Sequence, residues 1–554
     1  MKKYLLSVYI LVSIFITGQS QTSFSEDSGI YGQMLNDLKK NLYGERNVKK
    51  VTLDGKERTM FISWVRDHIH TMKAYKYWEK DLGSYLDFYM GRQTENGMYF
   101  DYWESYKNKN VGQLFFTNCF DRQFYFVDVN NQNFFFRMPM EADLEYLMVE
   151  GVFTYWQASG DTSYLRKWLP ALLRGMKYEM TDPLRWSSKN LLVKRPYTID
   201  TWDFTSQHDS LKSVEKLLGH IDNTEKTPKG IMHGDNSGMF RACKQLSIML
   251  TTTGQKYAAK EWSLQGDLIL QRLNALCWNG KYYSHFIPED PVPAHLKTDP
   301  LNSIGLSNTY SINRGSTTPA MAASIIESYR EIGEKTKGES VAPWYGVYPF
   351  IYPHFGNYQV GEYMNGAVLP LVGGELCKAA FQNGYEKYAV EQLLIIEKIL
   401  KANNGRLPGC ANGDGTAQKE AIPDEWGVAA FVSAIIEGLA GVVDEGILFE
   451  EVEISPRWYF AGINKTSVNI GYGSDGNQVG YQYIFSSKNN SIEISTSGKF
   501  KAFTLRVPVP EKMKNASASL NGKNTSATIE QINNSKYAVI KGSGSINRAV
   551  FSFR

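Results

Sequence analysis

One aspartate of this chain lies between two aromatic residues, in the segment Trp202-Asp203-Phe204-Thr205. Apolar neighbours disfavour the charged form of a carboxyl group and raise its pKa, so Asp203 would still hold a proton near neutral pH. A general acid needs that property, and pairs of carboxyl groups perform glycoside hydrolysis. The same four residues also fit a loop aspartate that caps a helix while its aromatic neighbours enter the core.

Three further segments combine aromatic residues with Asp, Glu or Asn close to expected turns. They are Trp64-Val65-Arg66-Asp67-His68, Gly361-Glu362-Tyr363-Met364-Asn365-Gly366, and the stretch from Gly409 to Glu425 that is followed by Trp426-Gly427. We expect Trp64, Trp202, Tyr363 and Trp426 to lie near a cleft, and most other aromatic residues on helices to belong to the core. Arg66 and Asp67 also fit a structural ion pair, and Glu141 and Asp143 also fit negative charges at the start of a helix.

The elements that would position these residues are helices, from about residue 61 to 445. Between Glu141 and Trp156 apolar residues recur at helical spacing, then Ala158-Ser159-Gly160-Asp161 forms a turn and a second helix starts near Leu165. The same layout recurs around Gly254 and around Gly384. Glycine suits the left-handed position after the end of a helix. Repeated helical hairpins over this length predict a mainly α fold, a closed helical toroid.

The pattern changes near Val443, where we place a domain boundary. Residues 446–554 alternate like strands, as in Phe449 to Pro456 and Thr504 to Pro510, and Asn521-Gly522 is a hairpin signal. Short strands with Asn, Gly and Ser turns predict a C-terminal β-sandwich. Residues 22–60 read as a polar N-terminal lead-in to the helical domain, which covers 61–445.

The N-terminus carries the features of an export signal. Met1-Lys2-Lys3 precedes an apolar run from Tyr4 to about Ile16, and small residues follow. This pattern predicts a signal peptide over residues 1–21 and a periplasmic or secreted mature protein. An uncleaved anchor is the alternative, although the run is short for a membrane span.

Composition excludes several other classes of protein. Hydrophobic residues make up 43% and charged residues 21% of the chain, as in globular proteins. A net charge of +3 gives no electrostatic reason to expect nucleic acid or membrane surfaces as partners. The five cysteines are far apart and form no CxxC motif, so neither a disulfide framework nor a zinc site is predicted, and Cys243 and Cys377 read as buried helix residues. His68, His70 and His233 lack metal-binding spacing, and no metal or cofactor is expected.

The order of these motifs resembles the (α/α)6 six-hairpin glycosidases, the superfamily of trehalases, processing α-glucosidases, glucoamylases and α-rhamnosidases. Trp202-Asp203-Phe204-Thr205 is similar to the segment that supplies their general acid, which implies that role for Asp203. The segment from Asp235 and Asn236 to Phe240 is similar to the helix that follows. Trp64 to Asp67 resembles the Arg-Asp motif that holds the sugar being cleaved. Tyr363 to Pro370, with Asn365, resembles the segment that lines the same subsite.

One position departs from the pattern of that superfamily. Its members place a general base, a Glu, shortly before the last Trp-containing helix, and Gly409 stands about where we look for it. The first candidates that remain are Asp414, which two glycines flank, and Glu362, and Glu420 comes after them. Glu425 abuts Trp426 but also fits the first turn of the last helix.

We therefore expect an exported glycoside hydrolase that inverts its substrate, with Asp203 as acid and a second carboxylate as base, and with a carbohydrate as its partner. Two alternatives stay open. One is a polysaccharide lyase for an acidic glycan, in which His68, His70, Tyr363, Asn365 and Arg66 serve. The other is a carbohydrate-binding protein without catalysis, which the missing Glu at Gly409 favours. The sugar, the linkage and the oligomeric state are not predicted.

Overall fold

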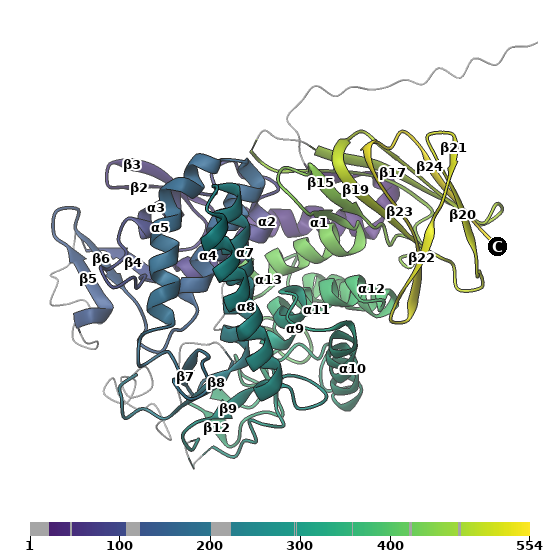
Figure 1. The fold of residues 1–554 in the computed structure, drawn as a ribbon. Coiled ribbons are helices and arrows are strands. Elements are labelled where there is room, and N and C mark those ends of the chain that lie inside the picture. Colours follow the sequence, from purple (N-terminus) through teal and green to yellow (C-terminus); the bar gives the residue numbers. More distant parts are fainter. Residues whose placement is uncertain are drawn as a thin grey trace, which may run out of the picture.

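The computed structural model describes residues 22–44, 47–106, 122–200, 223–292, 294, 296–356, 358–419, 424–474 and 478–554. Within them the chain has a helical domain and a C-terminal region of two sheets. The helical domain and the sheet region lie side by side in Figure 1. The prediction of a mainly helical part followed by strands is confirmed at this level. None of the helices described in this structure is both long enough and apolar enough to cross a membrane.

Six helices of the helical domain contact one another in cyclic order along the chain. Each contacts the next, and the last contacts the first. They are α2 (Val65–Tyr75), α4 (Leu144–Ser159), α7 (His233–Thr252), α9 (Ser307–Asn313), α11 (Pro370–Gln382) and α13 (Asp424–Ser433), the last continuing as a π-helix over Ala434–Leu439. We call these the ring helices. Their buried faces supply much of the core, for example Leu147, Leu246 and Leu376.

Six further helices each contact one or two ring helices. They are α1 (Ile30–Leu42), α3 (Ser84–Met90), α5 (Thr162–Glu179), α8 (Lys256–Cys277), α10 (Pro319–Lys335) and α12 (Glu386–Ala402), and α5 and α10 are those that contact two. The three predicted glycine turns are confirmed, because Gly160, Gly254 and Gly384 have φ values of 71°, 87° and 78° between paired helices. Cys243 in α7 and Cys377 in α11 are buried, as expected.

Small sheets precede the N-terminal ends of several ring helices. They comprise β2 (Lys49–Leu53) with β3 (Lys56–Met60), then β4 (Tyr102–Ser105), β5 (Tyr125–Asp128) and β6 (Asn133–Phe136), then β7 (Lys194–Pro196), β8 (Lys229–Met232) and β9 (Phe286–Pro288), then β10 (Ile304–Gly305) with β11 (Val347–Tyr348), and β12 (His354–Phe355) with β13 (Tyr358–Gln359). These strands fix the segments that enter α2, α4, α7, α9 and α11.

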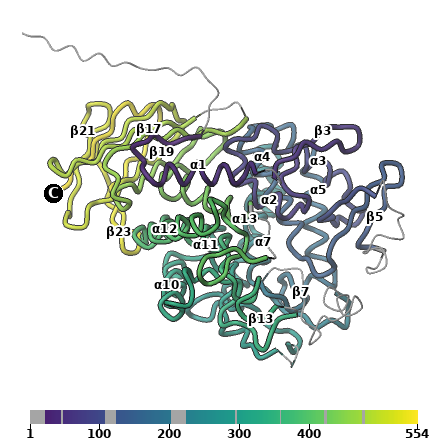
Figure 2. The backbone as a smooth tube through the Cα atoms, turned by 180° about the vertical axis from the view of Figure 1, so that it is seen from behind, coloured from purple at the N-terminus to yellow at the C-terminus, as the bar shows by residue number. Residues whose placement is uncertain are grey.

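Strands of the C-terminal region form a seven-stranded and a five-stranded sheet. The first contains, in order, β1 (Ser23–Phe24), β16 (Lys465–Gly471), β17 (Gln478–Ser486), β18 (Ser491–Thr496), β24 (Ala549–Phe553), β20 (Ala516–Leu520) and β21 (Lys523–Thr525). The second contains β14 (Val442–Asp444), β15 (Glu451–Ile454), β19 (Lys499–Pro508), β23 (Ser535–Ser545) and β22 (Thr528–Ile532). β1 comes from the other end of the chain, and in both overall views α1 lies at the junction of sheets and helices (Figures 1 and 2).

Candidate active site

Charged side chains gather at the N-terminal ends of the ring helices. Arg66 lies in the first turn of α2, Glu141 and Asp143 come just before α4, and Asp235 lies in the first turn of α7. All four are buried. Because helix N-termini carry a partial positive charge, this end of the ring favours carboxylates.

Arg66 forms the best-defined contact of this group. Its Nε lies 2.8 Å from one carboxylate oxygen of Asp143 and its Nη2 donates to the other at 2.9 Å, while Nη2 also lies 3.3 Å from Glu141. The backbone N–H of Arg66 donates to Asp101 at 2.9 Å. A planar guanidinium suits such a two-point contact with a carboxylate. An ion pair of Arg66 is thus present, with partners 75 and more residues away in the sequence.

Asp235 stands beside this pair and is buried completely. Its Oδ1 lies 3.4 Å from Nη1 of Arg195, and no described residue gives its Oδ2 a hydrogen bond. Burial raises the pKa of Asp235 to about 7, and the nearby carboxylates of Asp143 and Asp200 add to this rise, against the opposing effect of Arg195. The group therefore holds a proton through part of the neutral range.

Asp200 fixes the start of the segment that contains the predicted acid. Its carboxylate accepts hydrogen bonds from the backbone N–H of Ser307 at 3.0 Å and from the Ser307 hydroxyl, at the N-terminus of α9. Its own N–H donates to Nε2 of His285 at 2.7 Å. Burial lowers the pKa of His285 to about 4, which keeps this ring neutral and able to accept that bond. Trp202 and Asp203 lie outside the described residues.

Two of the predicted binding residues hold backbone segments in place. The Asn236 side chain accepts from Val193 N–H at 2.8 Å and donates to the carbonyls of Val193 and Met232, both at 2.9 Å. The Asn365 side chain accepts from Ile351 N–H and donates to Ile351 carbonyl, both at 2.9 Å. Asn236 ties Val193 to the first turn of α7, and Asn365 ties Ile351 to the segment that precedes α11, so these contacts position the loops.

Glu362 and Tyr363 line a cavity of about 680 Å³. Tyr363 stacks on Tyr358 with ring centroids 4.7 Å apart, and its N–H donates to Gln418 at 3.0 Å. Its φ of 45° is unusual for a residue with a bulky side chain, and such strained positions cluster at functional sites. The other lining residues are Tyr358, Val360, Gly361, Asn412, Ala417, Gln418 and Lys419.

The candidate bases differ in their surroundings. Glu362 is exposed and accepts from the N–H of Gln359 at 2.9 Å. Asp414 is also exposed, but its Oδ1 accepts both the hydroxyl of Thr416 at 2.6 Å and its N–H at 2.9 Å. These bonds lower the pKa of Asp414, and Asp414 does not line the cavity beside Glu362. Glu420 lies outside the described residues.

Two of the predicted aromatic residues, Trp64 and Trp426, lie at the neighbouring ring helices α2 and α13. Trp64, which directly precedes α2, is half-buried against Tyr102 and Phe136, at centroid distances of 4.6 and 5.4 Å. Trp426 in α13 is 5% exposed, stacks on His70 at 4.3 Å and donates from Nε1 to the Tyr310 hydroxyl at 2.8 Å. Asp67, next to Arg66, is 8% exposed.

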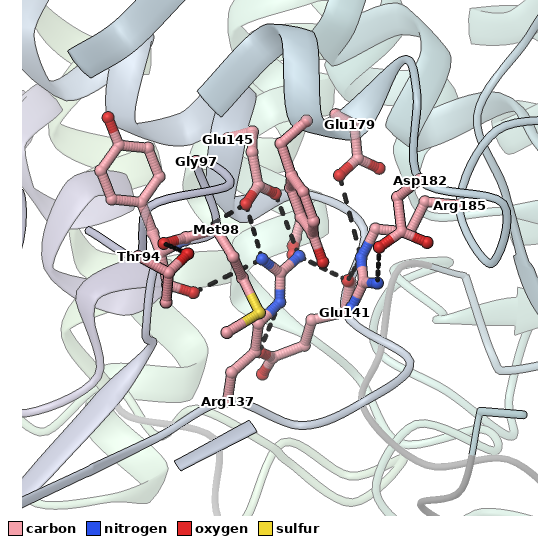
Figure 3. Close-up of polar contacts among 12 residues, drawn as sticks. Thr94, Gly97, Met98, Arg137, Glu141, Glu145, Glu179, Asp182 and Arg185 are labelled. Atoms are coloured by element: carbon pink, nitrogen blue, oxygen red, sulfur yellow. Dashed lines mark hydrogen bonds and ion pairs between the residues drawn. The ribbon is translucent and has the colours of Figure 1, made fainter. Parts of the chain in front are cut away.

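A buried network of ion pairs holds the backbone at Glu141 (Figure 3). Arg137 contacts the Glu145 carboxylate at 2.6 and 3.0 Å and donates to the Glu141 carbonyl at 2.7 Å. Arg185 donates to the same carbonyl at 3.2 Å and to that of Pro139 at 3.0 Å. Two arginines thus fix the segment that carries Glu141 and Asp143 towards Arg66.

Glu141, Asp143 and Arg195 are members of this cluster that the sequence did not single out as site residues. Glu141 and Asp143 read only as helix-start charges. Their position at the start of a ring helix, where Asp67 and Asp235 also lie, was the available signal. For Arg195 we find no such signal, since it belongs to a short strand.

No family model matches the chain, and no curated protein matches it either. Among solved structures, the α-L-rhamnosidase from Dictyoglumus thermophilum is similar over 97% of this chain and 50% of that chain, with a TM-score of 0.57 and 11% identity. A GH78 family rhamnosidase of Bacillus sp. GL1 is similar over 89% of this chain and 43% of that chain, with a TM-score of 0.55 and 12% identity. The Streptomyces avermitilis α-L-rhamnosidase, solved with L-rhamnose, is similar over 94% and 41%, with a TM-score of 0.52 and 11% identity.

These structures are similar to the chain in fold. The chain spans about half, or less, of the length of each of the three rhamnosidases that it matches. The similarity extends over both the helical domain and the sheets, since it covers nearly the whole chain. The arrangement of a helical domain with C-terminal sheets is therefore shared with rhamnosidases.

Proposed function

We propose that the protein is a glycoside hydrolase of the six-hairpin type, in which the ring helices form a closed (α/α)6 toroid and the two sheets form a β-sandwich. The observation that carries this proposal is the buried group of Arg66, Glu141, Asp143 and Asp235 at one end of the ring. The charge of nearby Asp200 helps to raise the pKa of Asp235, and the segment with the predicted acid Asp203 follows Asp200 in the sequence. Glycosidases use pairs of neighbouring carboxyl groups to hydrolyse the glycosidic bond.

In this proposal Asp203 protonates the glycosidic oxygen while a second carboxylate activates water on the opposite face of the sugar. Inversion requires the two carboxyl groups about 6.5–9.5 Å apart. We propose Glu362 as the base rather than Asp414. Glu362 lines a cavity with Tyr363, whereas Asp414 is engaged with Thr416 and has a lowered pKa, which makes a carboxylate a weaker base.

The proposed substrate is a non-reducing end of a glycan, and the fold shared with rhamnosidases makes α-L-rhamnosides the first compounds to assay. Arg66, Asp67, Trp64 and Trp426 would surround the cleaved sugar, with Trp202 contributed by the acid's own segment. We further propose that residues 1–21 are an export signal, so that the mature enzyme acts in the periplasm or outside the cell.

The test is hydrolysis by a chain that starts at residue 22, assayed on aryl α-glycosides and oligosaccharides with NMR of the released anomer. We expect an inverted product and a loss of about 10²–10⁴-fold in kcat/KM for Asp203→Asn. Asp209→Asn, which removes another carboxylate of the same segment, is the matched control and should stay near wild type. Activity that is indifferent to Asp203, or an unsaturated, ultraviolet-absorbing product, would overturn the proposal.

A second set of variants tests the base. We expect Glu362→Gln to lose about 10²–10⁴-fold in kcat and to recover activity with added azide, while Asp414→Asn retains most activity. Glu420→Gln completes the set. Azide rescue at Asp414 or Glu420 instead of Glu362 would move the base to that position without affecting the role of Asp203.

A further inference from the structure

A second polar cavity lies at the opposite end of the ring helices from the candidate active site. Its volume is about 380 Å³, and every ring helix contributes to its lining. At the C-terminal end of α2 the lining residues are Lys73 and, directly after the helix, Lys76, seven and ten residues beyond Arg66. At a rise of 1.5 Å per residue, Lys76 is about 15 Å from Arg66 along the axis. The two sites are therefore separate.

The wall opposite the helices comes from the C-terminal sheets. β14, β15 and β19 supply Val443, Asp444, Glu453 and Arg506, with Glu445 and Arg457 from the adjoining loops. A cavity between two parts of a fold is a common location for small-molecule sites. Its volume lies within the range of such sites, about 300–1,000 Å³.

Seven Lys and Arg residues and six Asp and Glu residues line this cavity, so its charges nearly cancel. Several of them pair with one another. Lys73 lies 2.5 Å from Glu375, Lys76 lies 3.0 Å from Glu437, and Arg506 lies 3.4 Å from Glu453. The lining thus favours a neutral occupant that makes many hydrogen bonds over a strongly charged one.

Arg241 has no such partner. It is exposed, and no described residue lies within ion-pair or hydrogen-bond distance of its side chain. Desolvation by the surrounding protein lowers its pKa, while Glu150 and Glu445 act in the opposite direction. Arg241 thus lines the cavity without an ion-pair or hydrogen-bond partner among the described residues.

Two amide oxygens of the lining accept no hydrogen bond from a described residue. Gln245 is 4% exposed, and neither its Oε1 nor Oδ1 of Asn313 has a hydrogen-bond partner among the described residues. Buried polar atoms are normally satisfied, so these acceptors call for an occupant with O–H or N–H groups. The guanidinium of Arg241 in turn lacks a hydrogen-bond acceptor. A hydroxyl group both donates and accepts hydrogen bonds, so a small ring with several hydroxyls would supply the missing partners of all three side chains.

We propose that this cavity binds a neutral, monosaccharide-sized polyol, held by Arg241, Gln245, Asn313 and Glu150, with Tyr310 and Phe153 beside its apolar face. The site differs from the proposed hydrolytic centre, and Tyr310 of its lining accepts a hydrogen bond from Trp426 at 2.8 Å. A sugar bound here is not the substrate that is cleaved.

The test is isothermal titration of the full mature chain with D-glucose, D-mannose, L-rhamnose and myo-inositol. We expect at least one of them to bind, and Arg241→Gln and Gln245→Leu each to weaken that binding about tenfold or more, since a hydrogen bond to a charged group contributes about 1.5–3 kcal/mol. Arg330→Gln is the matched control, because Arg330 is exposed and pairs with Glu327 outside the cavity. Its binding should equal that of wild type.

Two results would overturn the proposal. One is the absence of binding for all four compounds at millimolar concentration, which leaves the cavity to water. The other is binding that both cavity variants leave unchanged, which places the sugar elsewhere. Arg241 has no partner to lose, so its variant should keep the wild-type melting temperature. A protein that binds sugar in the cavity but hydrolyses no glycan would keep this inference and refute the proposed function.

Discussion

Asp235 combines complete burial with a pKa raised to about 7, mainly because of that burial. In the unfolded chain an aspartate has a pKa near 3.9. The folded protein therefore binds more protons between about pH 4 and 7. The free energy of unfolding must fall as pH rises through this window, and the loss is complete above it. One pKa unit corresponds to about 1.36 kcal/mol, so the total is up to about 4 kcal/mol.

Asp235→Asn should remove this pH dependence. We expect the unfolding free energy of the variant, measured by urea titration from pH 4 to pH 8.5, to fall less with rising pH than that of wild type. The difference between the two proteins isolates Asp235 from other titrating groups. The Asn variant of exposed Asp299 is the control, and it should follow wild type. Parallel curves for Asp235→Asn and wild type would contradict the raised pKa.

At the residue scale the sequence predicted Arg66, Asp67, Asp235 and the aromatic residues near them, because short motifs place these types at the starts of helices. It could not predict that Arg66 contacts Asp143, since 77 residues separate them. Nor could it predict that the amides of Asn236 and Asn365 are occupied by backbone groups. Such contacts depend on loop paths for which periodicity carries no information.

The start of α4 shows how a buried network shapes an element. Periodicity predicted a helix from Glu141, whereas α4 begins at Leu144. The difference has a physical cause, because the carbonyl of Glu141 accepts from both Arg137 and Arg185 and is held outside the helix. The end of the helix at Gly160, by contrast, was predictable from the left-handed conformation that glycine favours.

Arg137→Met should therefore destabilise the protein strongly. It leaves the Glu145 carboxylate buried without the guanidinium that lies at 2.6 and 3.0 Å from it, and breaking a buried pair costs about 3–5 kcal/mol. We expect a fall of that size in the unfolding free energy, measured by urea titration. Arg166→Met is the matched control, because Arg166 is exposed, and its effect should stay below about 0.5 kcal/mol. A small effect at Arg137 would show that this network does not hold the segment.

For the whole molecule, the two ends of the chain meet in one sheet. β1 pairs with β16 (Ser23 with Asn469 and Phe24 with Val468), and α1 then packs against α13 of the ring. Residues 22–44 thus join the sheets to the helices, as the position of α1 in Figures 1 and 2 also indicates. In the sequence this segment reads only as a polar lead-in, and the two-residue β1 leaves no periodic signal. For α1 a signal was available, because Tyr31, Leu35 and Leu38 recur at helical spacing.

Contacts across the boundary lead us to expect that helices and sheets unfold together. Glu386 of α12 accepts hydrogen bonds from Tyr537 and from Ser535 of β23, and the backbone N–H of Gly473 donates to the carbonyl of Lys76 at 2.8 Å. Tyr31 of α1 packs edge-on against Trp458, with ring centroids 6.4 Å apart. Calorimetry should show one transition for the mature chain, because no single part can unfold without exposing these buried groups.

Phe24→Ala tests this coupling at its N-terminal link. A buried Phe→Ala change costs about 3–5 kcal/mol, and the half-buried Phe24 should cost about 1–3 kcal/mol, which lowers the temperature of the whole transition. Phe126→Ala, at a ring that is 44% exposed on β5, is the matched control and should shift it less. A transition that splits in two for Phe24→Ala would mean that residues 22–44 carry the coupling almost alone. A transition already double in wild type would mean that the contacts at Glu386 and Gly473 are too weak to join the two parts.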